Sequence, residues 1–235
     1  MGLDIYVGGL VRYFTGDWEL IMQQGGRQNG VEVRVERAVP LDADPVQARE
    51  IILTWQSSLA AILKEDSNFD LSWDESPGAP YFTDKPDWIA YGGLLLWAAH
   101  DEHREGGSSP PVCVRPNWRE NAVYRASTAP NSGTMYPNLL CNAELWLPGN
   151  SMPFQCPGPT GAPTVVGFVD GVIDELLLLN SRTWNVEPPE AMGWARREPP
   201  GPLSLLEDAA KSGFAILLGL ALEAQTHALP MKLDY

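Results

Sequence analysis

Basic residues are scarce in this sequence, and their scarcity argues against one large class of ligands. The 235 residues include 16 Lys and Arg against 30 Asp and Glu, for a formal net charge of −14. Proteins that bind phosphate backbones do so by neutralising phosphates with Lys and Arg, so we expect no nucleic-acid ligand. An acidic surface instead favours solubility and fast encounter with basic partners.

Cysteine and long apolar runs are also rare. The three cysteines, Cys113, Cys141 and Cys156, are odd in number and form no C-x-x-C pair, which indicates a reducing compartment rather than a disulfide framework. The apolar stretch over residues 88–99 has 12 residues, against the roughly 20 that a membrane-spanning helix needs. The first charge is the acidic Asp4, whereas a secretory signal peptide begins with basic residues. We therefore expect a cytoplasmic protein with no membrane segment.

Local patterns predict an α+β fold in one domain over residues 1–235. Alternating or continuous apolar residues predict strands over residues 3–7, 31–37 and 139–147. Helical spacing predicts helices over residues 17–25, 45–65, 88–103, 169–181 and 203–228. We expect a mixed or antiparallel sheet of few strands with several packed helices and long Pro/Gly-rich loops.

Two helix starts and one loop carry specific signals. Asp44 precedes Pro45, a good first helical residue, and is expected to cap the helix. Ser204 and Glu207 have the spacing of a capping box. Residues 148–163 contain five prolines and three glycines in 16 positions, so we expect an exposed loop there rather than a strand.

Asp4 is the first candidate for chemistry. An aspartate at the end of a first strand can help hold Mg²⁺ where other carboxylates converge on it. The stretch Leu3–Val7 also alternates, with Asp4 and Tyr6 on one face and apolar residues on the other. The simpler prediction is an ordinary strand whose acid faces outward.

His100 and His103 are the second candidate, since residues three apart share one face of a helix. Zinc sites use such pairs but need a third and usually a fourth ligand. The spacing matches no standard zinc pattern. Histidines in a last helical turn also interact favourably with the negative end of the helix, so a structural role is the competing explanation.

Signatures of covalent or nucleotide chemistry are missing. The sequence contains no G-x-S-x-G elbow, no P-loop and no dinucleotide fingerprint. With three histidines in the chain, a serine or cysteine nucleophile has few candidate bases. We assign no catalytic residue.

Aromatic residues on acidic or Pro-rich loops indicate a partner-binding surface, because exposed aromatic side chains are typical anchors of interfaces. Most of the other aromatics have the spacing of core residues. The candidates in the acidic loop 66–87 and in the loop 148–163 are Asp70, Trp73, Asp74, Glu75, Tyr81, Asp84 and Phe154.

Three stretches, MGLDIYVGGLVRYFTGDWEL, ELWLP and ALPMKLDY, resemble a group of bacterial cytosolic proteins that open with a similar MGLDIYVG sequence. The resemblance spans the whole chain. No activity is known for that group, so it implies a bacterial origin and assigns no functional residue.

These observations lead to two functional hypotheses. The first is a non-enzymatic, acidic protein-interaction module, similar to an immunity protein or antitoxin, that masks a basic protein partner such as a toxin and needs no cofactor. The alternative is a metal-dependent hydrolase that holds Zn or Mg with Asp4, His100, His103 and nearby carboxylates.

Overall fold

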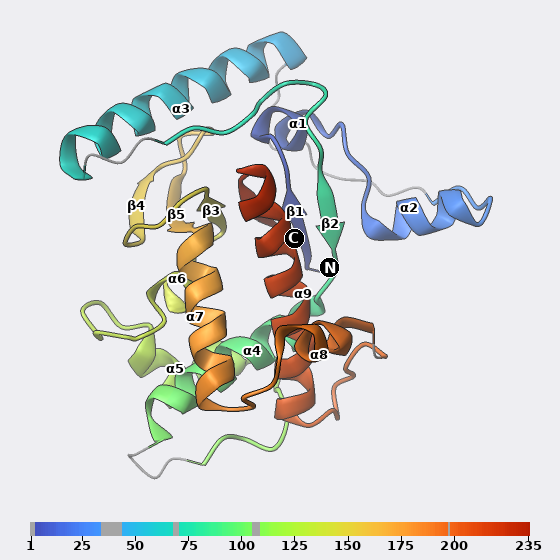
Figure 1. Cartoon of the computed structure of the whole chain (residues 1–235), viewed down its shortest axis with the longest axis vertical. Coiled ribbons are helices and arrows are strands. Elements are labelled where there is room, and N and C mark those ends of the chain that lie inside the picture. The colour runs from blue at the N-terminus through green and yellow to red at the C-terminus, as the bar shows by residue number, and fades with distance from the viewer. Residues whose placement is uncertain (1–2, 34–43, 68–70, 105–108, 197) are drawn as a thin grey trace.

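A six-stranded mixed sheet forms the centre of the computed structural model, which describes residues 3–33, 44–67, 71–104, 109–196 and 198–235 (Figure 1). The strand order is β2-β1-β6-β3-β5-β4. β3 and β5 are parallel, and the other neighbouring strands are antiparallel. The strands are β1 (Asp4–Val7), β2 (Phe82–Asp84), β3 (Leu145–Leu147), β4 (Phe154–Pro157), β5 (Pro163–Phe168) and β6 (Met231–Asp234).

Helices cover both faces of this sheet, which confirms the predicted α+β class. They are α1 (Leu10–Thr15), α2 (Ile21–Gln28), α3 (Pro45–Ser67), α4 (Asp87–Glu102), α5 (Ala122–Ser127), α6 (Pro137–Leu140), α7 (Val169–Arg182), α8 (Pro188–Met192) and α9 (Leu206–His227), with short 3₁₀ helices η2 (Trp118–Glu120) and η3 (Gly193–Arg196). None of the described helices combines the length and the apolar character needed to cross a membrane.

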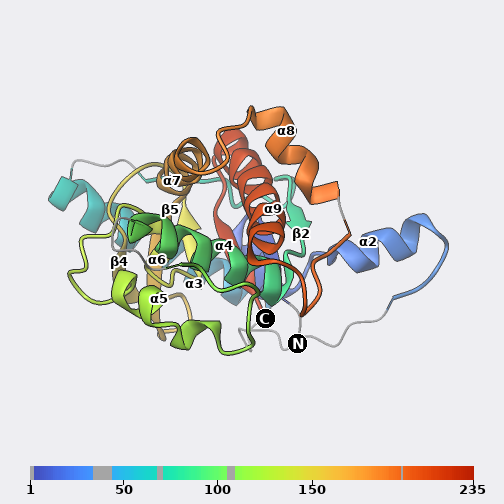
Figure 2. The ribbon, with the colours of Figure 1, turned by 90° about the horizontal axis from the view of Figure 1, so that it is seen from below.

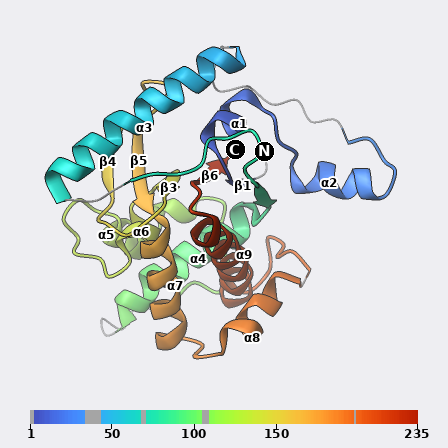
Figure 3. The ribbon, with the colours of Figure 1, turned by 45° about the horizontal axis from the view of Figure 1, so that its top comes forward.

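The first strand shows how the sheet divides the core. Ile5 and Val7 belong to a cluster formed with α4, α7 and α9, whereas Tyr6 packs with residues of α1 and α3. Figure 3 shows α3 on one side of the sheet, with α7 and α9 on the other. Because both faces are covered, all of β1 is buried, including Asp4. The predicted outward position of Asp4 is therefore wrong.

Small residues allow α4 and α9 to cross closely (Figure 2). A Cβ atom added to Gly213 of α9 would lie 2.3 Å from the carbonyl oxygen of Ala90 in α4. One added to Gly93 of α4 would lie 2.8 Å from the Cβ of Ala209 in α9. The helix backbones thus approach to a distance that side chains at these glycines would prevent.

The long helices follow their sequence signals. The Asp44 carboxylate accepts hydrogen bonds from the backbone N–H groups of Val46 and Gln47, at 2.8 and 3.0 Å, as expected of an N-cap. The helix expected to start at Asp17 differs. α1 ends at Thr15 and is followed by Gly16, which has a φ of 73°, and α2 begins at Ile21. Asp17 is exposed outside both helices.

Three further predictions need correction. Residues 31–33 form no strand, and the rest of the predicted strand 31–37 lies outside the described residues. Residues 154–157 form β4 within the expected loop 148–163; β4 is an edge strand, where proline removes no ladder bond that the sheet requires. The Oγ atom of Ser204 accepts a hydrogen bond from Gly201 and does not cap α9.

Candidate functional site

Two of the predicted partner-binding residues, Trp73 and Glu75, are buried at 8% and 6% exposure. The indole of Trp73 packs against Trp55 of α3 and donates a hydrogen bond to Glu75. Glu75 also accepts the backbone N–H groups of Leu10 and Val11, both at 2.8 Å. The loop therefore folds onto the α3 side of the sheet, and neither side chain is accessible to a partner. This corrects their predicted role.

The remaining members of that set are spread over the fold. Asp74 is exposed, and hydrogen bonds from Ser76 lower its pKa. Asp84 is half-buried in β2, and burial raises the pKa of its carboxyl group. Tyr81 and Phe154 are half-buried against the cluster that contains Tyr6. Asp70 lies outside the described residues. The binding role of these five residues stays a prediction.

The residues of the metal hypothesis are separated by the sheet. By strand alternation Asp4 faces the side of α1 and α3. His100, 7% exposed, lies in the last turns of α4 on the opposite side, and His103 follows the helix end with its Nε2 3.9 Å from Glu102. Among the described residues no group of three or more His, Cys, Asp or Glu is arranged to hold a metal ion. The fold does not bring the proposed ligands together.

Two of the three thiols, those of Cys141 and Cys156, are not activated as nucleophiles. Burial raises the pKa of Cys141 to about 12 and also raises that of Cys156. Both are therefore protonated at physiological pH, whereas a reactive cysteine needs a lowered pKa.

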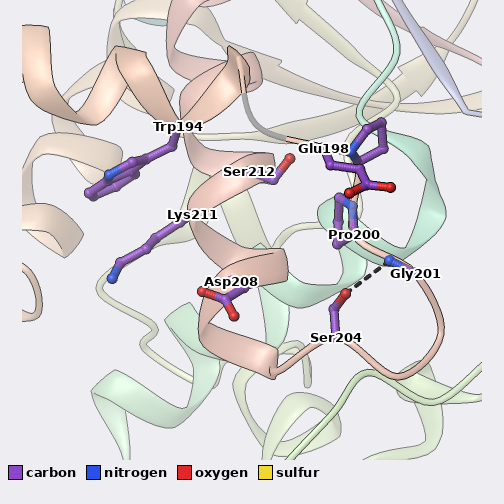
Figure 4. A pocket seen from close by; sticks show the side chains of 9 residues that line it. Trp194, Glu198, Pro200, Gly201, Ser204, Asp208, Lys211 and Ser212 are labelled. Carbon is purple, nitrogen blue, oxygen red and sulfur yellow. Dashed lines mark hydrogen bonds between the residues drawn. The ribbon is translucent and has the colours of Figure 1, made fainter.

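A cavity of about 570 Å³ lies beside α9 (Figure 4). Its lining includes Asp208, Lys211 and Ser212 of α9 and residues of the segment 198–204. Lys211 is paired with Glu207 at 2.7 Å and lies over the ring of Trp194. Figure 4 shows the Trp194 and Lys211 side chains extending away from the segment 198–204. This cavity therefore presents polar groups without an open aromatic face.

A second cavity, of about 450 Å³, has walls of a different kind. It lies on the α4 side of the sheet, next to the end of β6 and the start of β3. We call it the aromatic pocket. It is lined by Trp88, Tyr91, Leu95, Trp118, Arg119, Tyr124, Asn142, Ala143, Glu144, Leu233 and Tyr235. Binding sites for small molecules typically have this size and combine aromatic walls with a few convergent polar groups.

Four segments position these side chains. Trp88, Tyr91 and Leu95 lie on one face of α4 because they are three and four residues apart. The side chain of Asn121 caps α5 by accepting the N–H groups of Val123 and Tyr124, which fixes the start of that helix. η2 immediately precedes it. The remaining walls come from the residues before β3 and from β6 and the residue after it.

Two of the three tyrosine hydroxyl groups in the pocket, those of Tyr124 and Tyr235, are engaged as donors. Tyr124 donates to the side-chain oxygen of Asn142 at 2.7 Å, and Tyr235 donates to Glu144. Asn142 has a φ of 59°, a left-handed conformation that asparagine tolerates better than most residues. Burial raises the pKa of both Tyr124 and Tyr235 to about 12. Both hydroxyls are therefore neutral at physiological pH.

Arg119 lies at the aromatic wall. Its guanidinium carbon is 4.8 Å from the ring centre of Trp88 and 4.4 Å from that of Trp118. The Arg119 charge also opposes the rise in pKa of Tyr91, Tyr124 and Tyr235, so it lies close enough to influence these hydroxyls. Arg119 is exposed and has no ion pair with a described residue.

Sequence reasoning missed this pocket because it treated most aromatic residues as core. The spacing of Trp88, Tyr91 and Leu95 indicated a common helix face, but nothing local connects that face with Trp118 or Tyr235. Comparison of the chain with protein-family models, curated proteins and solved structures finds no match in any of the three, so its function is inferred from the geometry of its own residues.

Proposed function

We propose that the protein binds a small organic molecule in the aromatic pocket. The observation that carries this proposal is the convergence of five aromatic rings from separate segments on one cavity of about 450 Å³. Tyr91, Trp118 and Tyr124 are buried, whereas Trp88 is half-buried and Tyr235 is 57% exposed. Exposed apolar surface of this kind is typical of ligand- or partner-binding sites. The ligand of this proposal has a flat or apolar part that packs on the indole rings and a polar part that reaches Glu144 and Asn142.

The proposal is non-enzymatic. Arg119 and Glu144 are the ionisable side chains of the lining apart from the tyrosines, whose hydroxyls are neutral. No described nucleophile with a lowered pKa lines the cavity. Because all three cysteines are free, we keep the cytoplasm as the proposed location.

A ligand screen tests the proposal. Ligand-observed NMR with a panel of cationic, neutral and anionic ring compounds should identify binders of the wild-type protein. Trp88→Ala and Tyr235→Ala each remove one wall, and each should weaken those binders about tenfold or more, as expected when a buried aromatic contact is lost. Phe154→Ala is the matched control, because Phe154 is a half-buried aromatic residue on the opposite face of the sheet. Binders that respond equally to all three variants, or no binder in the panel, would refute the proposed function.

A second candidate is the acidic protein-interaction function that the composition predicts, including the masking of a basic partner. Its specific support is α2, which projects from the body of the protein (Figure 1). No residue of α2 is buried, and Ile21 and Met22 are 38% and 52% exposed. A photo-reactive amino acid at Met22 should cross-link one basic protein in the native host. The control places the same photo-reactive amino acid at position 57, an exposed site on α3. If both positions give the same cross-linked products, the contact is not specific to α2.

A further inference from the structure

We infer that the ligand of the aromatic pocket is a small-molecule cation with delocalised or alkylated charge, such as a guanidinium or quaternary ammonium compound, and that Arg119 occupies its position when the pocket is empty. This inference rests on the proposed function and specifies the chemistry of the ligand. Three features of the pocket carry it.

The first feature is the balance of hydrogen-bonding groups. A hydroxyl group has one proton to donate, and those of Tyr124 and Tyr235 are used within the protein. What these two hydroxyls can still offer a ligand is oxygen lone pairs. Glu144 adds carboxylate oxygens. The Asn142 amide also lines the pocket and can donate through its N–H groups, whereas the oxygens of Tyr124, Tyr235 and Glu144 accept. The three oxygen-bearing side chains therefore favour a ligand that donates hydrogen bonds or carries positive charge.

The second feature is that a cationic side chain, Arg119, already lies over the two indole rings. The guanidinium of Arg119 lies within 5 Å of the ring centres of both Trp88 and Trp118. Cations within about 6 Å of an indole face are attracted by the negative face of the ring, and the attraction strengthens when the cation is desolvated. The two rings are therefore arranged around a flat cation.

The third feature is that Arg119 can leave. Its side chain is exposed, it belongs to the three-residue helix η2, and no described carboxylate pairs with it. A turn of the side chain into solvent uncovers both indole faces. Glu144, the sole carboxylate among the described lining residues, then supplies the counter-charge for the entering cation. Its Oε2 atom is 3.9 Å from Lys232 Nζ, so the ligand shares this carboxylate with Lys232. Arg119 thus acts as an internal competitor of the ligand.

Isothermal titration calorimetry with three matched probes tests this inference. The probes share a hydroxyphenyl ring and differ in charge: meta-hydroxyphenyl trimethylammonium, its neutral isostere meta-tert-butylphenol, and meta-hydroxybenzoate. They are titrated into the full-length wild-type protein and into Arg119→Gln. Arg125→Gln is the matched control, because it removes the same charge from an exposed position on α5 that does not line the pocket. Circular dichroism and the melting temperature verify that each variant folds.

Arg119→Gln should bind the ammonium probe about tenfold more tightly than the wild type, because the competing cation–π contact is lost. The neutral isostere should change less than threefold, and Arg125→Gln should bind all probes like the wild type. The inference is overturned if Arg119→Gln leaves the ammonium probe unchanged or weakens it. It is also overturned if the benzoate binds the wild type most tightly and loses affinity in Arg119→Gln, which would make Arg119 an anion-binding residue. In either case, the proposed function would still stand if the ligand panel described above contains compounds whose binding is weakened by Trp88→Ala.

Discussion

Two buried glutamates hold short helices in place. Glu175, on α7, accepts the backbone N–H groups of Asn138 and Leu139 at 2.8 Å each, in the first turn of α6. Glu75 does the same for Leu10 and Val11 in α1. Helix starts leave N–H groups without partners inside the helix, and a carboxyl oxygen can accept hydrogen bonds from them. Each glutamate thus satisfies donors that its short helix cannot satisfy itself.

The ionisation of Glu175 should make stability depend on pH. Burial is the largest cause that raises its pKa from 4.5 to about 7, against the opposing hydrogen bonds from Asn138 and Leu139. A raised pKa means that the folded state holds this proton more tightly. The stabilising contribution is therefore full below about pH 4.5 and is lost as the pH rises through about 7. The loss should be on the order of 3 kcal/mol between about pH 4 and about pH 8.

Chemical denaturation of Glu175→Gln across this pH range measures that contribution. The variant should be less stable than the wild type, because its amide group presents a donor to one backbone N–H, but the pH-dependent fall should be missing. Asp208→Asn removes an exposed carboxylate on α9 that is not among the causes of the Glu175 shift, and it should keep the wild-type pH profile. If Glu175→Gln and the wild type have parallel profiles, Glu175 does not titrate in this range.

Trp73 should act on stability rather than on partner binding. Its indole is 8% exposed and is hydrogen-bonded to Glu75. Replacement of a buried tryptophan by alanine typically costs about 3–5 kcal/mol, so Trp73→Ala should lower the free energy of unfolding by about that amount in urea titrations. Trp73→Phe, which keeps a ring, should lose less. An unchanged free energy of unfolding would show that the indole is accessible and would restore its predicted role as a partner-binding anchor.

At the scale of secondary-structure elements, the crossing of α4 and α9 depends on glycine. A Cβ atom at position 213 would lie 2.3 Å from the backbone oxygen of Ala90, which cannot move without shifting α4. Gly213→Ala should therefore destabilise the protein by about 3 kcal/mol, even though alanine favours helices. Gly25→Ala in α2 is the control; the added methyl group meets nothing within 4 Å, and the substitution should stabilise by up to about 1 kcal/mol. Equal effects of the two substitutions on the melting temperature would contradict the close crossing.

The end of α9 contains a correctable strain. Ala228 follows the helix with a φ of 48°, in the left-handed region, where glycine is the usual residue. Ala228→Gly should raise the free energy of unfolding by about 0.5–1 kcal/mol, because the left-handed conformation penalises a Cβ atom. Ala61→Gly on the exposed face of α3 should instead lower it by about 1 kcal/mol. A loss of stability in Ala228→Gly would show that this backbone conformation is not strained.

Helices with both a capping residue and regular apolar spacing in the sequence were predictable. Strands that form only by pairing with distant residues were not. The Asp44 cap and the apolar spacing of Ile52, Leu59 and Leu63 predicted α3 closely. Nothing near residue 154 predicts β4, because its ladder comes from pairing with β5. The valines at 31 and 33 alternate like a strand, yet no strand forms there, since alternation alone supplies no neighbouring strand.

At the scale of the whole molecule, the sheet decides which residues can meet. It keeps Asp4 apart from His100, although both looked suited to a metal site in the sequence. It also brings Tyr235, after the last strand, to the same cavity as Trp88 and Trp118. Such a site has no sequence signature, because its members come from four segments that only the fold assembles. The acidic composition was visible in the sequence, but the position of the aromatic pocket was not.

A crystal structure after soaking with meta-hydroxyphenyl trimethylammonium tests the central claim most directly. The account predicts density for the probe in the aromatic pocket, with its ammonium group against Trp88 and Trp118, and with Arg119 turned into solvent. Density for the probe only elsewhere, for example in the cavity beside α9, with Arg119 still lying over both indole rings at saturating probe, would contradict it.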